Sequence, residues 1–168
     1  MIMTIREVCF LLTENNPKTI AEIKKLGILL KKLGSGAYRN TYKVIGLPIV
    51  LKIPNDTPAA RRHSEEEIKV VKKIKRLRKY RILRKYMPYI HFYNPKTRII
   101  GMQYYDTKSN KYKDGTASIL SDLIEEVWSD ASRSSADIHR ENIALDKEGQ
   151  IKIIDLGYFT ERGRGWSS

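Results

Sequence analysis

The apolar residues first follow a strand-like pattern between residues 28 and 54. Three segments there, ILLKKL, AYRNTYKVI and IVLKI, are rich in β-branched and aromatic residues, which favour strands. Gly34-Ser35-Gly36 punctuates the first pair, and Gly46-Leu47-Pro48 makes a tight turn between the second pair. Residues 89–93 and 98–105 predict a hairpin across the turn Asn94-Pro95-Lys96-Thr97.

Two short helices are predicted before the first strand. Residues 2–12 form one, and Asn15-Asn16-Pro17 breaks the chain after it. Thr19 caps the second, roughly Ile20 to Leu26, with Glu22 as its capping-box partner.

Two longer helical patterns follow. Residues 59–86 predict one long basic helix that Pro88 ends, and residues 117–131 predict an amphipathic helix. The apolar stripe of the basic helix is marked by Ile68, Val71, Ile74 and Leu77. Gln150 to Ile154 reads as a last strand, so the predicted order is three strands, helix, two strands, helix, loop and strand.

The composition is that of a globular protein rather than a membrane-spanning or disulfide-linked one. The chain has 168 residues and is 41% hydrophobic, which is adequate for a packed core. It holds one cysteine, Cys9, so we expect no internal disulfide, and no stretch reaches the length of apolar residues that a membrane span needs. We expect no signal peptide and a cytoplasmic protein without membrane contact. The net charge of +13 favours an acidic partner.

The strand region contains candidate phosphate-binding groups. Glycines in LGSGAYRNTYKV, residues 33–44, would let backbone N–H groups approach phosphate oxygens, although an ordinary hairpin turn also explains them. Lys52 lies in the apolar segment IVLKI, where it is either paired or on an edge strand facing water. Glu67 could pair with Lys52, whereas Glu65 and Glu66 suit the first turn of a helix, where carboxylates complement the dipole.

The last third of the chain contains candidate catalytic and metal-binding groups. Asp137 and Asn142 lie five residues apart in DIHREN, before the apolar segment IAL, and Asp155 follows a strand in IIDLG. An Asp can orient a hydroxyl group, and carboxylate and amide oxygens suit Mg²⁺. Each could instead be a turn-forming residue. The glycine-rich segment, Lys52, Glu67, the Asp137–Asn142 pair and Asp155 together match, in chain order, what phosphoryl transfer needs.

These segments resemble the protein-kinase-like superfamily over roughly residues 28–157. LGSGAYRNTYKV resembles its glycine-rich loop, VLKI the strand with the ATP-phosphate lysine, and EIKVVKKI the helix with its glutamate partner. RIIGMQYYD resembles the fifth strand and hinge, and DIHRENIALDKEGQIKIIDLG the catalytic loop through the metal-binding motif. The catalytic loop also resembles that of aminoglycoside- and choline-kinase-like members.

The resemblance implies an ATP- and Mg²⁺-dependent kinase with roles for particular residues. Lys52 and Glu67 would form the phosphate-binding pair, and Asp137 would be the catalytic base. Asn142 and Asp155 would hold Mg²⁺. The implied ATP-binding residues are Gly34, Ser35, Gly36, Tyr38, Lys52, Met102 as the gatekeeper, and the backbone of Gln103, Tyr104 and Tyr105.

The resemblance also implies a fold. We expect an α+β protein with a five-stranded antiparallel N-lobe sheet, a long helix carrying Glu67 and a much reduced helical C-lobe. The expected domains are an N-terminal helical extension over residues 1–27, the N-lobe over 28–105 and the reduced C-lobe over 106–168. Only eleven residues follow Gly157, so we expect no complete activation segment. A second copy of the chain could complete the C-lobe as a homodimer.

Two departures from the family pattern affect the expected function. Arg39 replaces the third glycine of the loop, where it could crowd the phosphates or contact them. Ser135-Ala136 replaces the His-Arg that normally precedes the catalytic Asp, so control by activation-loop phosphorylation is not expected.

The charge is concentrated in residues 61–86, which hold twelve Lys or Arg and three Glu, a net of +9. This segment could bind nucleic acid or an acidic protein, or it could simply be a solvated helix face. Tyr80 and Tyr86 within it could stack on bases or pack inward. Three functions therefore remain: a kinase with an unknown protein or small-molecule phosphoacceptor, a binding pseudokinase, and a nucleic-acid binder.

Overall fold

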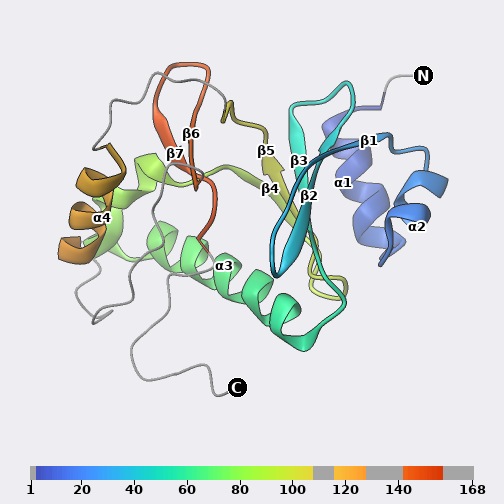
Figure 1. Cartoon of the computed structure of the whole chain (residues 1–168), viewed down its shortest axis with the longest axis horizontal. Helices are drawn as coiled ribbons and strands as arrows, with labels where there is room; N and C mark the ends of the chain where they lie inside the picture. The colour runs from blue at the N-terminus through green and yellow to red at the C-terminus, as the bar shows by residue number, and fades with distance from the viewer. Residues whose placement is uncertain (1–2, 108–115, 128–141, 157–168) are drawn as a thin grey trace. The chain divides into compact units, whose positions relative to one another are not determined.

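The computed structural model describes residues 3–107, 116–127 and 142–156, which form an α+β architecture (Figure 1). The chain divides into two units. The first unit contains Met1–Glu65 and Tyr89–Tyr104, and the second contains Glu66–Pro88 and Tyr105–Ser168.

The first unit begins with helices α1, Ile5–Glu14, and α2, Ile20–Lys25, as the sequence predicts. Both have a complete capping box. Thr4 and Glu7 cap α1, and Thr19 and Glu22 cap α2 through reciprocal side-chain and backbone hydrogen bonds. Local sequence therefore sets where each helix begins.

A five-stranded antiparallel sheet follows, and its strand order is β1-β2-β3-β5-β4. The sheet predicted from the sequence is thus confirmed, and β3 lies at its centre. The strands are β1, Leu30–Ser35; β2, Arg39–Val44; β3, Ile49–Pro54; β4, Ile90–Tyr93; and β5, Ile100–Gln103.

One face of the sheet forms a common core with α1 and α2, which lie beside it in Figure 1. Val8 and Leu12 of α1 and Ile23 of α2 are fully buried in this core. Alternate residues of β3 complete it, namely Ile49, Leu51 and Ile53. Because neighbouring residues of a strand point to opposite faces, Val50 and Lys52 belong to the other face.

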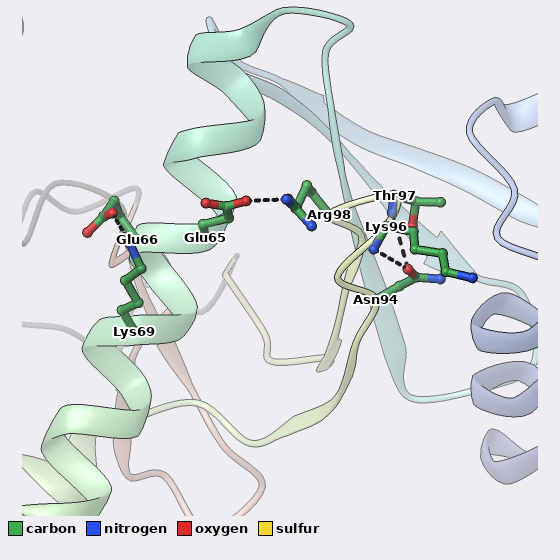
Figure 2. Close-up of polar contacts among 7 residues, drawn as sticks. All are labelled: Glu65, Glu66, Lys69, Asn94, Lys96, Thr97 and Arg98. Atoms are coloured by element: carbon green, nitrogen blue, oxygen red, sulfur yellow. Dashed lines mark hydrogen bonds and ion pairs between the residues drawn. The ribbon is translucent and has the colours of Figure 1, made fainter.

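The turn between β4 and β5 is held by the side chain of Asn94, which bonds both to the turn itself and to α1. The Oδ1 atom of Asn94 accepts hydrogen bonds from the backbone N–H groups of Lys96, at 2.8 Å, and Thr97, at 3.1 Å (Figure 2). The Asn94 side-chain amide donates to the carbonyl of Leu12 at 2.9 Å, which ties the turn to α1. The predicted hairpin is confirmed, and a buried Asn fixes its turn.

The prediction of one long basic helix over residues 59–86 is wrong for its second half. Helix α3 covers only Pro58–Arg76, and the hydroxyl of Thr57 accepts a hydrogen bond from the Ala60 N–H at its start. Leu77 has extended backbone, and a 3₁₀ segment, η1, runs through Arg78–Tyr86. Residues at a spacing of three, rather than 3.6, point inward in η1, which favours 3₁₀ over α geometry.

The second unit also contains α4, Thr116–Val127, and a hairpin of β6, Ile143–Leu145, with β7, Ile151–Ile153. Both α4 and β7 contact η1. The predicted last strand is confirmed as β7, but β6 was not predicted as a strand. The end of the predicted helix over residues 117–131, including Trp128, lies outside the described residues.

Within the described ranges, no helix is both long and apolar enough to cross a membrane.

Candidate functional site

A row of paired residues crosses the sheet, and Lys52 lies in this row on the central strand β3. Gly34 of β1 pairs with Thr41 of β2, Thr41 pairs with Lys52 of β3, and Lys52 pairs with Ile100 of β5. Residues paired directly across an antiparallel sheet share a face, and adjacent strands lie about 4.8 Å apart. The backbone of Gly34 is therefore roughly 10 Å from that of Lys52, two strand spacings away.

Lys52 is only 4% exposed. The alternative that Lys52 is an edge-strand lysine pointing to water is wrong, because β3 is the central strand. The ion pair between Lys52 and Glu67 stays a prediction.

Two apolar residues lie near Lys52 on its face of the sheet. Val50 and Met102 are paired with each other one row along, and both are buried. Arg39 also belongs to this face by alternation along β2, and its side chain is 6% exposed. The face thus combines an apolar region around Met102 with the two cations Arg39 and Lys52. Ligand sites commonly combine an apolar lining with a few polar or charged groups.

The fold requires glycine at neither Gly34 nor Gly36. A Cβ atom built on Gly34 meets no atom within 4 Å, and one built on Gly36 reaches only the Arg39 carbonyl oxygen, at 3.6 Å. Neither residue has a positive φ angle, in contrast to Gly46, with φ +84°. The space beside Gly34 in the Lys52 row is therefore open, as a ligand-binding role would need.

Asn55 fixes the tip of the glycine-rich hairpin, a role that the sequence did not reveal. Its side-chain amide donates to the carbonyl of Ala37 at 2.9 Å, and its backbone N–H donates to the carbonyl of Tyr38 at 2.8 Å. Its Oδ1 atom accepts from the side chain of Asn40 at 2.9 Å. The only sequence signal was a turn-forming Asn directly after a strand.

The ring of Tyr38 stacks on His63 of α3, with 4.7 Å between ring centroids and 19° between planes. Ser35 ends β1 and pairs with Asn40, so it lies at the base of the hairpin tip. The predicted phosphate loop is therefore a closed hairpin in this structure, and its aromatic tip rests on the first half of α3.

Two backbone N–H groups of the predicted adenine-binding segment already donate hydrogen bonds within the protein. The Gln103 N–H donates to the Tyr89 carbonyl and the Tyr104 N–H to the Pro48 carbonyl, each at 2.8 Å. A purine could not accept hydrogen bonds from these two N–H groups without displacing a partner. Tyr105 is 8% exposed.

The three glutamates of α3 have three different environments. Because α3 begins at Pro58, none of them lies in its first turn, so the dipole explanation for Glu65 and Glu66 is wrong. Glu65 pairs with Arg98 at 2.5 Å, and Glu66 pairs with Lys69 at 2.6 Å (Figure 2). Glu67 is fully buried, at 0% exposed, as a structural or site carboxylate would be.

The structure brings the two predicted metal ligands together. The Ile154 N–H donates to the Asn142 carbonyl at 2.8 Å, just beyond the paired strands β6 and β7. Asp155 directly follows Ile154, so Asn142 and Asp155 lie at the same end of the hairpin. Asp137, the predicted catalytic base, lies outside the described residues.

Asn142 and Asp155 each carry a side-chain oxygen of the kind that Mg²⁺ prefers. Among the residues that the structure describes, no group of three or more His, Cys, Asp or Glu side chains could hold a metal ion. Mg²⁺ is commonly bound by one or two carboxylates together with substrate phosphates.

A separate cavity of about 360 Å³ in the first unit is lined by none of the predicted site residues. One cation and two carboxylates there are already engaged: Arg61 pairs with Asp56 at 2.6 Å, and Glu22 accepts from the backbone N–H groups of Lys18 and Thr19. We regard it as a polar depression between helix and turn, not as the site.

Neither protein-family models nor curated proteins match this chain, so a function for this site rests on its residues and their geometry.

Proposed function

We propose that the chain is an ATP- and Mg²⁺-dependent phosphotransferase with a protein-kinase-like fold. It would transfer the γ-phosphoryl group of ATP to a hydroxyl group of a protein or a small molecule. The bond from the γ-phosphorus to the bridging oxygen breaks, a bond to the acceptor oxygen forms, and ADP leaves. The acceptor proton passes to a base, for which Asp137 is the candidate.

The row from Gly34 through Thr41 to Lys52 carries this proposal. It combines a buried lysine on a central strand with a glycine that leaves its own face open. A lysine cation beside the phosphates is one of the parts that phosphoryl transfer needs, and Lys52 would supply it to a phosphate bound over the open space at Gly34. An ordinary hairpin turn explains the glycines but not the position of Lys52 in the same row.

The remaining residues supply supporting chemistry. Val50 and Met102 are buried apolar residues on the face of Lys52, and adenine would pack against this region. Asn142 and Asp155 offer oxygen atoms to Mg²⁺, which when bound would neutralise charge on the phosphates.

A binding pseudokinase is the second candidate. The observation that favours it is the closed glycine-rich hairpin, in which Asn55 bonds to the loop backbone and Tyr38 stacks on His63. Such a chain would bind ATP, or only a partner, without transferring phosphate.

Phosphate transfer from γ-labelled ATP tests the proposal. Label would be followed into the chain itself and into hydroxyl-bearing acceptors, with Mg²⁺ present. We compare Lys52→Met with Lys32→Met, a matched loss of one lysine from an exposed position on β1. Transfer that is lost in Lys52→Met and kept in Lys32→Met supports the proposal. Equal transfer by both variants contradicts it, and ATP binding without any transfer favours the pseudokinase.

A further inference from the structure

Exposed cations are concentrated on α3 and η1 in the second unit. Between Glu66 and Pro88 lie ten Lys or Arg residues, nine of them exposed, against the two carboxylates Glu66 and Glu67. Six of these cations form what we call the basic surface: Lys69, Lys72, Arg76, Arg78, Arg81 and Lys85.

The spacing of these cations follows the helix type. In α3, Lys69, Lys72 and Arg76 are three and four residues apart, which places them on one face. In η1, Arg78 and Arg81 are three residues apart, so they lie one above the other about 6 Å apart along the 3₁₀ axis. Tyr80 and Leu83 point inward and are fully buried. The cations therefore form regular rows on the outside.

Within the part of the chain that the structure describes, the ion pairs involve one cation of the basic surface, Lys69. Lys69 pairs with Glu66 at 2.6 Å (Figure 2), and Glu67 is fully buried. Among the described residues, no carboxylate pairs with Arg76, Arg78 or Arg81. Arginine forks match phosphate oxygens with two parallel hydrogen bonds. Rows of unpaired arginines favour a partner that brings regularly spaced anions.

Arg84 has a different role from the arginines of the basic surface. Its guanidinium group donates to the carbonyl of Ile74 at 3.2 Å and to that of Leu77 at 3.4 Å. These are carbonyls at the C-terminal end of α3, where a cation stabilises the helix. Arg84 thus fixes η1 against α3, and it is excluded from the basic surface.

The basic surface ends at a hollow. A cavity of about 340 Å³ is lined by Lys85, Tyr86, Gly149, Gln150 and Ile151. The ammonium group of Lys85 lies 4.8 Å from the centre of the half-buried Tyr86 ring. The Gln150 side chain could donate to and accept from the edge of an unpaired base.

The composition of the surface favours nucleic acid over an acidic protein. The cores of protein interfaces are depleted in charge and enriched in apolar and aromatic residues, whereas nucleic-acid interfaces are polar and strongly positive. Between Glu66 and Pro88 the large apolar residue that is notably exposed is Ile82, at 45%. Tyr80 is buried, so its predicted alternative role in stacking on bases is wrong.

We propose that the basic surface binds single-stranded nucleic acid, with the phosphodiester backbone along the rows of cations and an unpaired base at the Gln150 hollow. The site is independent of the proposed ATP site, because none of the cations on the basic surface is assigned a role there.

Binding of a labelled single-stranded RNA tests this proposal on the full chain. The salt dependence of the Kd is measured for wild type and for the triple variant Arg76→Gln, Arg78→Gln, Arg81→Gln. The matched control is Lys24→Gln, Lys31→Gln, Lys32→Gln, which removes three exposed cations from the first unit. Single-stranded DNA, a duplex and polyglutamate of equal charge serve as competing probes. Circular dichroism and melting confirm that each variant is folded.

We expect the arginine variant to weaken binding of all sequences alike and to reduce the slope of log K against log salt by about 2, for three lost phosphate contacts to a single strand. The lysine control should bind as wild type does. If single-stranded RNA and DNA bind with equal affinity, the phosphodiester is the recognised group. If RNA binds more tightly, the ribose 2′-hydroxyl is recognised as well. No binding at low salt, equal loss in both variants, or equal binding of polyglutamate would overturn the proposal. Tighter binding of the duplex would overturn its single-strand part.

Discussion

Replacing Gly34 or Gly36 by alanine separates a role in the fold from a role in binding ATP. A methyl group at Gly34 meets nothing within 4 Å, and at Gly36 it makes an ordinary contact at 3.6 Å. Neither residue needs a positive φ angle. Alanine at a compatible position reduces the entropy of the unfolded chain, so we expect each variant to be as stable as wild type or more stable, by about 0.4–1 kcal/mol.

Binding should change in the opposite direction. The methyl group of Gly34→Ala would enter the open space at Gly34 in the row of Lys52, where the proposed phosphate lies. Loss of one hydrogen bond to a charged phosphate oxygen costs about 1.5–3 kcal/mol. That corresponds to a roughly ten- to hundredfold higher Kd for ATP.

Gly101 supplies the matched control within the same sheet. A Cβ atom there would lie 2.1 Å from Cε1 and 2.3 Å from Cδ1 of Phe92, closer than real atoms come. The ring must move, and such overpacking typically costs about 1–3 kcal/mol. Gly101→Ala should therefore lower the melting temperature, whereas Gly34→Ala and Gly36→Ala should not.

The assay combines thermal melting without ligand and ATP titration in the presence of Mg²⁺. Stable Gly34→Ala and Gly36→Ala variants that bind ATP as wild type does would refute the phosphate-loop assignment. The hairpin would then be an ordinary turn. A lower melting temperature of these variants would show that the fold requires glycine at these positions.

Two further predictions concern parts of the first unit. Hydrogen bonds from the Lys18 and Thr19 N–H groups hold the pKa of Glu22 below its ordinary value of 4.5. The ionised Glu22 carboxylate therefore stabilises the fold above the ordinary pKa, and this stabilisation is lost as pH falls through the lowered pKa. Glu22→Gln should reduce the fall of the melting temperature on the acid side of its pH profile. Asn55→Ala should lower the stability of the fold by about 1 kcal/mol per lost hydrogen bond, and it should speed amide exchange at Ala37 and Tyr38. The control Asn15→Ala removes a hydrogen bond at the end of α1 and should leave this exchange unchanged. Unchanged exchange in Asn55→Ala would contradict the role assigned to Asn55.

Local signals in the sequence were sufficient for the helix starts and tight turns. The Thr19–Glu22 capping box and the Gly46 turn depend on residues within four positions of each other, so their chemistry can be read without knowledge of the fold. The five strands were predicted for the same reason, from short segments with β-forming residues.

Features that depend on distant residues were missed or misread. The break at Leu77 separates α3 from η1, but an inward spacing of three is close enough to 3.6 to read as one helix. Strand β6 has only three residues, and its partner β7 identifies it. Pairing with Arg98 gives Glu65 its role, and the two residues are 33 positions apart in the chain.

The site was predicted as a set of residues but not as a geometry. The Gly34–Thr41–Lys52 row follows from strand register, including an irregularity between Lys32 and Gly34. A shift of one residue would turn every side chain of β1 to the other face. Asn55 was missed because its hydrogen bonds reach back to residues of the hairpin tip across two strands.

Melting of the purified chain with ATP, with Mg²⁺ and with both tests the central claim most directly. Mg²⁺·ATP at 100 times its Kd should stabilise the chain by about 2.7 kcal/mol, or roughly 5–10 °C for a chain of this size. Mg²⁺ alone should have no such effect, because Mg²⁺ in sites of this kind is commonly bound together with substrate phosphates. Asp155→Asn should remove the effect of Mg²⁺, whereas Asp122→Asn, an exposed position on α4, should keep it. No shift with Mg²⁺·ATP, or an equal shift in Asp155→Asn, would contradict the proposed nucleotide site.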